Sequence, residues 1–180
     1  MRVAIATTVL VVALTVGSLP AASATVRASS AGADPTPAQI RTALGRAERA
    51  KSLWATVNIC DTRADPNVLG VRGQMPSLGF PAWLSMQIHL NYYNQAKKTF
   101  VADPRTTKTI RLGRSAHGLQ QGGATYTFKG PTPVLRASVR FIWRRSGQTL
   151  GTTPMITTGG HPSADFGSPA HFSAASCQIR

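Results

Sequence analysis

Acidic residues are scarce in this chain. It has six Asp and Glu against 20 Lys and Arg in 180 residues, which gives a formal net charge of +14 at pH 7. Glycoside hydrolases usually need two carboxylates about 5–10 Å apart on rigid elements. Asp61, Asp65 and Asp103 instead stand in turn-like sequences beside Pro or Arg, where turn formation and capping explain them. The composition therefore argues against a two-carboxylate glycosidase.

The motifs of metal and nucleophile chemistry are also missing. The chain contains no C-x-x-C, no H-x-x-x-H and no G-x-S-x-G sequence. An EF-hand interpretation of the segment 61–67 fails, because Arg63 takes a ligand position and Pro66 replaces the required glycine. We therefore expect no metal, no cofactor and no catalytic group. A hydrolase built from His161, Asp165 and a nearby serine remains the weakest of the functional hypotheses.

Aromatic residues make up only 7% of the chain. Most of them are expected in the core, namely Phe80, Trp83, Tyr92, Phe100, Phe128, Phe141 and Trp143. Trp54, Tyr93 and Tyr126 remain as candidates for an exposed position, and they are scattered in sequence. A stacking platform for single-stranded nucleic acid needs several exposed aromatic residues, so no specific nucleic-acid partner is predicted.

Long apolar runs are absent apart from one at the N-terminus. Arg2 precedes the uncharged run from Val3 to Gly17, and the small residues 22–24 follow it. This order is typical of a secretory signal peptide, predicted here as residues 1–24. A retained membrane anchor is the alternative, but the 15-residue run is shorter than the roughly 20 residues that a spanning helix needs. We expect a secreted, extracellular protein whose residues 25–35 form a flexible tether, with no transmembrane segment after signal removal.

The excess of basic residues predicts attraction to polyanions. Removal of residues 1–24 takes away Arg2 and no acidic residue, so the net charge changes only from +14 to +13. For an exported protein, the expected partners are an anionic cell-wall polymer, a polysaccharide or a surface protein. The alternative is that the basic charge only keeps the domain soluble.

The rest of the chain predicts one short helix followed by strands. Thr36, Pro37 and Gln39 form a helix-start signature, so a helix is expected at about 36–51. Strands are expected at 53–60, 68–75, 84–93, 97–101, 107–113, 124–129, 135–144, 149–158 and 172–179. Short strands separated by turn residues are typical of an antiparallel sandwich.

Two of these strands, 84–93 and 135–144, alternate between apolar and mostly polar residues. In 135–144, the alternation places Arg136, Arg140 and Arg144 together on one face. Arginine ladders suit phosphate and carboxylate groups. The candidate anion-binding residues are Arg136, Arg140, Arg144, Lys97, Lys98, Lys108, Arg111 and Arg114. The alternative is an ordinary solvated strand face.

Two cysteines in an exported chain favour a disulfide. We therefore predict a bond between Cys60, in an early strand, and Cys177, in the last one. With Trp83 opening a middle strand, this pattern resembles secreted bacterial proteins with an immunoglobulin-like β-sandwich. The resemblance implies an all-β, antiparallel immunoglobulin-like sandwich of about 8–9 strands with one short N-terminal helix, a single domain over 36–180. It implies no activity, because sandwiches host many unrelated functions.

Three functional hypotheses follow. The leading one is a binding or surface-interaction module for an anionic envelope component or a partner protein. The second is a structural or accessory secreted protein with no ligand site. The third is the hydrolase described above, so enzymatic activity is not the expected function.

Overall fold

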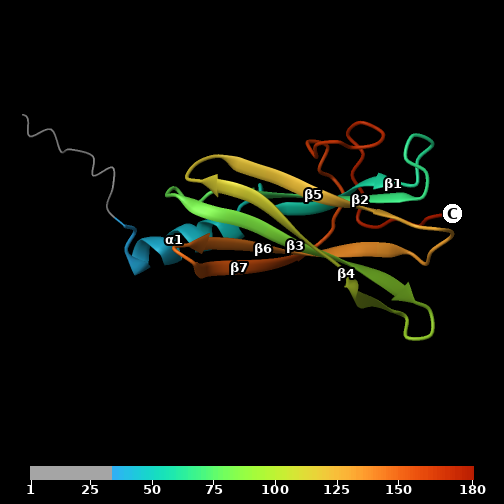
Figure 1. Cartoon of the computed structure of the whole chain (residues 1–180), viewed down its shortest axis with the longest axis horizontal. Helices are drawn as coiled ribbons and strands as arrows, with labels where there is room; N and C mark the ends of the chain where they lie inside the picture. The colour runs from blue at the N-terminus through green and yellow to red at the C-terminus, as the bar shows by residue number, and fades with distance from the viewer. Residues whose placement is uncertain (1–33) are drawn as a thin grey trace, which may run out of the picture. The chain divides into compact units, whose positions relative to one another are not determined.

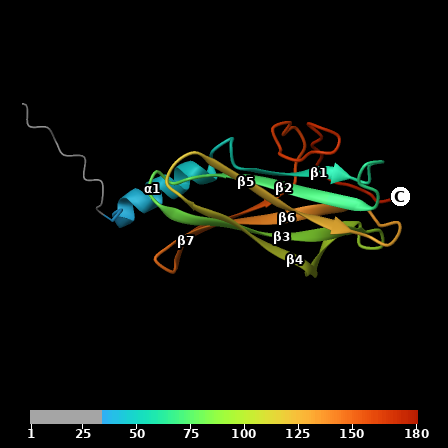
Figure 2. The same cartoon turned by 45° about the horizontal axis from the view of Figure 1, so that its top comes forward.

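Two antiparallel sheets packed face to face form the architecture (Figures 1 and 2). A computed structural model describes residues 34–180, so the predicted signal peptide (1–24) and residues 25–33 of the predicted tether lie outside the described residues. The elements are α1 (Pro37–Glu48), β1 (Trp54–Cys60), β2 (Val68–Pro76), β3 (Ala82–Asn94), β4 (Thr99–Ser115), β5 (Leu119–Thr127), β6 (Leu135–Arg145) and β7 (Gln148–Ile156).

The sheets have three and four strands. The strand order is β1-β2-β5 in the first sheet and β4-β3-β6-β7 in the second. The all-β, antiparallel prediction with one short helix is confirmed. The predicted number of strands, 8–9, is wrong, since residues 34–180 form seven. One predicted pair of strands is a single strand, and the last predicted strand does not form.

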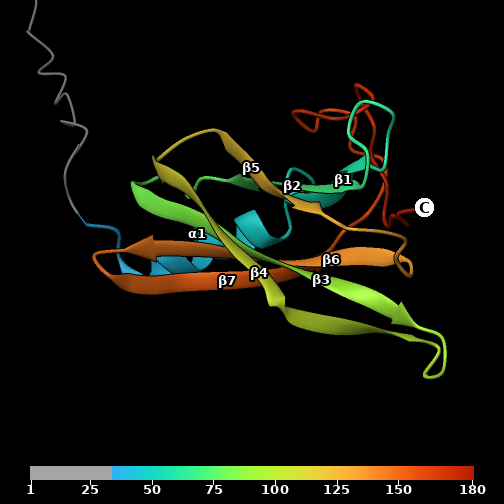
Figure 3. The same cartoon turned by 45° about the vertical axis from the view of Figure 1, so that its right-hand side comes forward.

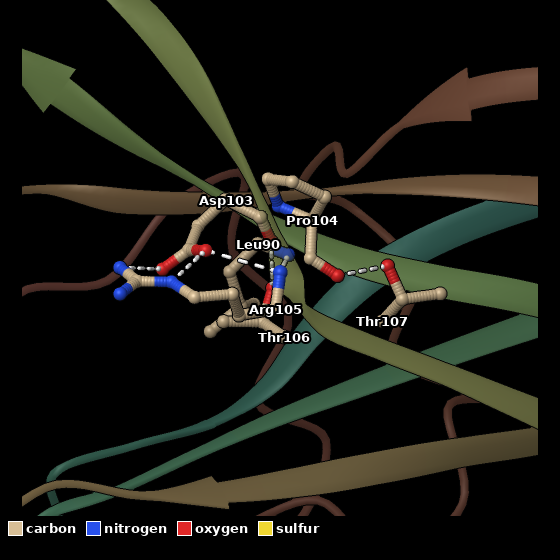
Figure 4. A network of polar contacts seen from close by, with 6 residues as sticks. All are labelled: Leu90, Asp103, Pro104, Arg105, Thr106 and Thr107. Carbon is tan, nitrogen blue, oxygen red and sulfur yellow. Dashed lines mark hydrogen bonds and ion pairs between the residues drawn. The ribbon is translucent and has the colours of Figure 1, made fainter.

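The pair predicted at 97–101 and 107–113 is the single strand β4, interrupted by a bulge. Opposite β3, the register jumps from Lys108, which faces Ile88, to Asp103, which faces Leu90. The extra residues fold onto themselves (Figure 4): the Thr106 hydroxyl donates to the Asp103 carbonyl at 2.6 Å and accepts from the Leu90 N–H at 2.8 Å. This hydroxyl takes the place of a strand partner for the Leu90 amide, so β4 continues through the segment that predicted a turn.

The last predicted strand, 172–179, belongs to an irregular C-terminal segment, defined here as residues 157–180. It pairs with the sheets through isolated bridges, which join Val57 to Ala174, Ile59 to Ser168 and Leu135 to Cys177. The two antiparallel bridges, at Val57 and Leu135, each have two backbone hydrogen bonds of 2.7–2.9 Å. The segment therefore connects the first sheet to the second, and none of these contacts is long enough to make it a strand.

The disulfide between Cys60 and Cys177 is confirmed. It joins the end of β1 to the C-terminal segment, and the residues it links are 117 positions apart. Cys177 is 3% exposed and Ile179 is fully buried. The bond therefore holds the end of the chain against the core.

The predicted helix forms as α1, and its capping box is confirmed. The Gln39 N–H donates to the Thr36 hydroxyl at 3.3 Å, and the Thr36 N–H donates to the Gln39 side chain at 2.7 Å. Ala43 and Ala47 of the helix are buried. Leu44 packs closely on Gly151 of β7, because a Cβ atom added to Gly151 would lie only 2.7 Å from the Leu44 side chain. The apolar stripe of α1 therefore covers β7.

Tyr126 of β5 was an exposed candidate in the sequence, but it is 8% exposed. Its hydroxyl donates to the Ile88 carbonyl at 3.3 Å, and burial raises its pKa to about 12. The neutral phenol therefore stabilises the fold fully below the unfolded-state value near pH 10, and that contribution is lost as the pH rises toward 12.

Subtracting the absorbance of Y126F from that of the wild type isolates the phenolate signal of Tyr126. We predict that this difference signal develops near pH 12. The alkaline unfolding of the wild type should also be steeper than that of Y126F between pH 10 and 12. Titration of the difference signal near pH 10 in the folded protein would contradict the assigned burial.

Candidate functional site

The outer surfaces of the two sheets differ in what covers them. On the three-stranded sheet, the C-terminal segment lies across the outer side of β1 (Figure 3). The Asn58 amide donates to the carbonyls of Asp165 and Phe166 at 2.9 and 3.1 Å, and the Thr56 and Ser173 hydroxyls lie 2.7 Å apart. Thr56 and Asn58 are therefore buried although they point away from the core. This outer surface is occupied by the chain itself.

The same segment explains the environment of Trp54, which the sequence placed among the candidates for exposure. Trp54 is 4% exposed, because its ring stacks on His161 with the ring centroids 4.9 Å apart. His161 also contacts the Thr158 hydroxyl at 2.9 Å, and burial lowers its pKa. No carboxylate orients this imidazole among the described residues, so the arrangement needed for the His161–Asp165 hydrolase does not form.

The outer surface of the four-stranded sheet is open over the described residues. Along β3 and β6, apolar residues point inward, and Trp143, Phe141 and Met86 are fully buried. The outer face, as we call it, is formed by the alternate residues Trp83, Ser85, Gln87 and His89 of β3, Arg140, Ile142 and Arg144 of β6, and Thr109, Arg111 and Arg114 of β4.

Trp83 dominates the outer face. Trp83 is 57% exposed, which contradicts the core position expected for it. The sequence contained the signal that was missed. Since Leu84 points inward, the period of two places Trp83 on the opposite face, with Ser85.

Arginines surround this tryptophan on both neighbouring strands. Trp83 is paired in register with Arg144 of β6 and with Arg114 of β4. Side chains directly opposite on adjacent strands have Cβ atoms about 4.5–5.5 Å apart. An open depression of about 370 Å³ lies beside the indole, and its lining includes Trp83, Ser85, Arg111, Arg144 and Gly147. The Arg144 guanidinium donates to the Gly147 carbonyl at 2.9 Å, which holds it at the rim.

No carboxylate neutralises these arginines within residues 34–180. The two ion pairs of this part of the chain are Arg105–Asp103 in the β4 bulge and Arg145–Asp34 beside α1. The Arg105 contact is the main cause that lowers the Asp103 pKa. Arg111, Arg114, Arg140 and Arg144 are all exposed. Arg144 uses one donor on the Gly147 carbonyl, and its remaining N–H groups stay available to solvent or a ligand.

The structure brings together only part of the predicted anion-binding set. Arg111, Arg114 and Arg144 surround Trp83, and Arg140 lies further along β6 on the same face. Arg136 is also on β6, but its guanidinium lies 4.0 Å from the centre of the Phe100 ring, so its stacking surface is already used. The predicted ladder of three therefore has two freely exposed members.

The predicted lysines lie elsewhere. Lys97 and Lys98 occupy the turn between β3 and β4, outside the cluster around Trp83. The Lys108 ammonium donates to the Thr125 carbonyl of β5 at 2.6 Å and lies 4.6 Å from the centre of the Tyr126 ring. Lys108 thus bridges β4 to β5, between the two sheets.

The acidic loop considered for calcium is satisfied by the protein backbone. Asp61 accepts hydrogen bonds from the N–H groups of Asn67 at 2.7 Å and Arg180 at 2.9 Å. These bonds, the one from Arg180 first, lower the Asp61 pKa. Over residues 34–180, no group of three or more His, Cys, Asp or Glu side chains is placed to hold a metal ion.

The comparisons with known proteins add no identity to this geometry. The sequence matches no protein-family model, no curated protein and no solved structure. In the part of the chain from residue 34 onward, no helix combines the length and the apolar character needed to cross a bilayer.

Proposed function

We propose that this protein is a binding module for an anionic polymer and that the outer face of the four-stranded sheet is its binding surface. The observation that carries the proposal is the cluster of Arg111, Arg114 and Arg144 around an exposed tryptophan, with no carboxylate partner among residues 34–180. Arginine donates in a planar fork that suits carboxylate and phosphate oxygens.

The contrast between the two sheets supports the choice of face. The C-terminal segment covers the outer side of β1, whereas the outer face keeps Trp83 and four arginines in solvent. Residues 34–180 contain 18 basic and six acidic residues, so the domain attracts polyanions over a range set by salt. The grouping of these arginines around an exposed indole favours a ligand site over basic charge that only keeps the domain soluble.

Export remains part of the proposal. A disulfide between distant residues persists in oxidising compartments, and the Cys60–Cys177 bond is of this kind. We accordingly place the protein outside the cytoplasm, where an anionic cell-wall polymer or polysaccharide is within reach.

We also propose that the fold is an immunoglobulin-like sandwich, and the strand topology is the basis for this proposal. Seven strands in two antiparallel sheets with crossed connections support it. The order β4-β3-β6-β7 assigns the fourth strand to the sheet of the third, unlike the constant-type immunoglobulin domain. The disulfide also joins β1 to the C-terminal segment instead of linking two core strands across the sheets.

The experiment compares R111A/R144A with the control R41A/R63A. Both variants lose two exposed arginines, but Arg41 lies on α1 and Arg63 in the turn between β1 and β2. At about 0.15 M salt, R111A/R144A should bind polygalacturonate or sodium polyphosphate roughly tenfold more weakly than wild type, since exposed ion pairs contribute about 0.2–1 kcal/mol each. The control should stay within about twofold.

Calorimetric titration measures both affinities, and thermal melting establishes that the variants fold. Equal weakening in the two variants would mean that only total charge matters. No measurable binding of either polyanion by the wild type would also refute the proposal.

A further inference from the structure

We infer that the ligand is a polysaccharide built from carboxylated sugar rings, with one ring stacked on Trp83 and its carboxylate held by Arg144 or Arg111. This inference rests on the proposed function and goes further, because it assigns the chemistry of the repeating unit. Anion binding alone explains the arginines, but it does not explain the tryptophan.

Trp83 contributes little to the folding core. The other two tryptophans of the chain, Trp54 and Trp143, are 4% and 0% exposed, whereas Trp83 is 57% exposed. An exposed indole on a strand face is an apolar surface that the fold leaves available. Its neighbours on β3 are Ala82, which is buried, and Leu84, which points into the core, so the indole stands apart from the buried cluster.

The indole face is free to receive a ring. Among the described residues, cation–π contacts occupy the rings of Phe166, Tyr126, Phe100 and Phe80, and none of them involves Trp83. The negative face of an aromatic ring attracts the positively polarised C–H groups that a pyranose presents on its flat side. Polyphosphate has no ring to stack on the indole, and a nucleic-acid strand needs several exposed aromatic residues as a stacking platform, whereas Trp83 is the one exposed tryptophan of the chain.

The arginines beside the indole then account for the carboxylate. Arg144 lies directly across the strand pair from Trp83, and Arg111 pairs with Ser85, two residues further along β3. A ring on the indole therefore has a guanidinium on either side, at neighbouring and diagonal positions of the sheet. The depression of about 370 Å³ falls in the range of roughly 300–1,000 Å³ typical of small-molecule sites.

The outer face also continues beyond the first ring. Arg140 is four residues from Arg144 on β6, which at about 3.3 Å per residue places their Cα atoms roughly 13 Å apart along the strand. Gln87 of β3 lies in register beside Arg140 and offers an amide. A linear acidic polysaccharide running along the strands would meet Arg144 and Trp83 first and Arg140 next.

Tryptophan fluorescence tests this inference directly, because Trp83 is the one exposed tryptophan of the three. The full chain is titrated with polygalacturonate, with sodium polyphosphate of matched charge and with neutral dextran. Polygalacturonate should shift the emission to the blue and protect it from acrylamide. Polyphosphate should bind without that change, and dextran should not bind.

The variants W83A and R111A/R144A separate the two contributions, and W83F retains a smaller ring. W83A should weaken polygalacturonate binding roughly tenfold and leave polyphosphate binding within about twofold. W83F should lie between W83A and wild type. R111A/R144A should weaken binding of both polyanions, with R41A/R63A as the control.

Each outcome decides a different point. If W83A binds polygalacturonate as wild type does, while R111A/R144A weakens both polyanions, the sugar-ring inference is wrong and the proposed function stands. If R111A/R144A behaves like R41A/R63A, both are wrong. If sedimentation shows a wild-type dimer that W83A converts to a monomer, the outer face is an interface between copies of this chain, and both proposals fall.

Discussion

Replacing both Cys60 and Cys177 with serine should lower the free energy of unfolding by about 4–5 kcal/mol. The two residues are 117 positions apart, and in the chain-entropy model a cross-link over a loop of about 100 residues removes roughly that much entropy from the unfolded state. For a chain of this size, about 1 kcal/mol corresponds to roughly 2–4 °C. The melting temperature should therefore fall by roughly 10–20 °C.

In the variant without the disulfide, the C-terminal segment should open locally at a lower free energy than global unfolding requires. Cys177 exchanges two backbone hydrogen bonds with Leu135, and Ala174 exchanges two with Val57. Once the disulfide is absent, the end of the segment is held by noncovalent contacts such as these bridges. Hydrogen exchange at the amides of Val57 and Leu135 should accelerate more than exchange in β3.

Reduction of the wild type provides the matching control. The reduced wild type and C60S/C177S should melt at the same temperature, because the missing bond is their common change. A melting temperature within about 2 °C of the oxidised protein would show that the bond adds almost nothing to stability.

Trp143→Ala should destabilise the protein by about 3–5 kcal/mol. Trp143 is fully buried between the sheets, so its removal leaves a large cavity in the core. Its indole N–H also donates to the Pro76 carbonyl of β2 at 2.9 Å, a bond that links the two sheets. Chemical denaturation measures the change in the free energy of unfolding.

The same replacement at Trp83 is a matched control. Leu84, the residue after Trp83, faces Trp143 in the register of β3 and β6, and the two indoles lie on opposite faces of this sheet. W83A should change stability by less than about 1 kcal/mol, because its side chain is mostly in solvent. W143F should lose less than W143A, since it keeps an aromatic ring but not the bond to Pro76. Equal losses in W83A and W143A would contradict the assignment of the two faces.

Several parts of the fold were accessible from local sequence. Thr36 and Gln39 predict the start of the helix, because a capping box involves residues only three positions apart. The alternation through β3 and β6 correctly separates inward from outward residues. The cysteine pairing followed from there being two cysteines in a chain with an export signature.

Apart from Trp83, whose outward position follows from the period of two, the errors at β4, Trp54 and Tyr126 arise where segments distant in sequence meet. The sequence 97–113 contains a turn-like Asp103-Pro104, but Thr106 supplies the hydroxyl that lets β4 continue beside β3. Trp54 and Tyr126 looked available for exposure, but His161 stacks on the first and the sheets enclose the second. Neither covering group is near in sequence, so periodicity carries no sign of them.

For the candidate site, the sequence by itself determined the residue types and the face of each strand. The excess of arginine, the shortage of carboxylates and the period of two together place Arg140 and Arg144 on one side of β6. Tertiary structure alone decided which neighbours these arginines have. The register between β3, β4 and β6 groups Trp83 with Arg111, Arg114 and Arg144, and it leaves Lys108 bridging to β5.

The physical reason is that side-chain direction is a local property, whereas strand order and surface covering are not. The alternation of inward and outward side chains follows from the backbone of one strand. Strand pairing and burial depend on contacts between residues far apart in sequence, such as Thr56 and Ser173, which are 117 positions apart. The C-terminal segment closes one sheet surface and leaves the outer face open, and no local pattern specifies that choice.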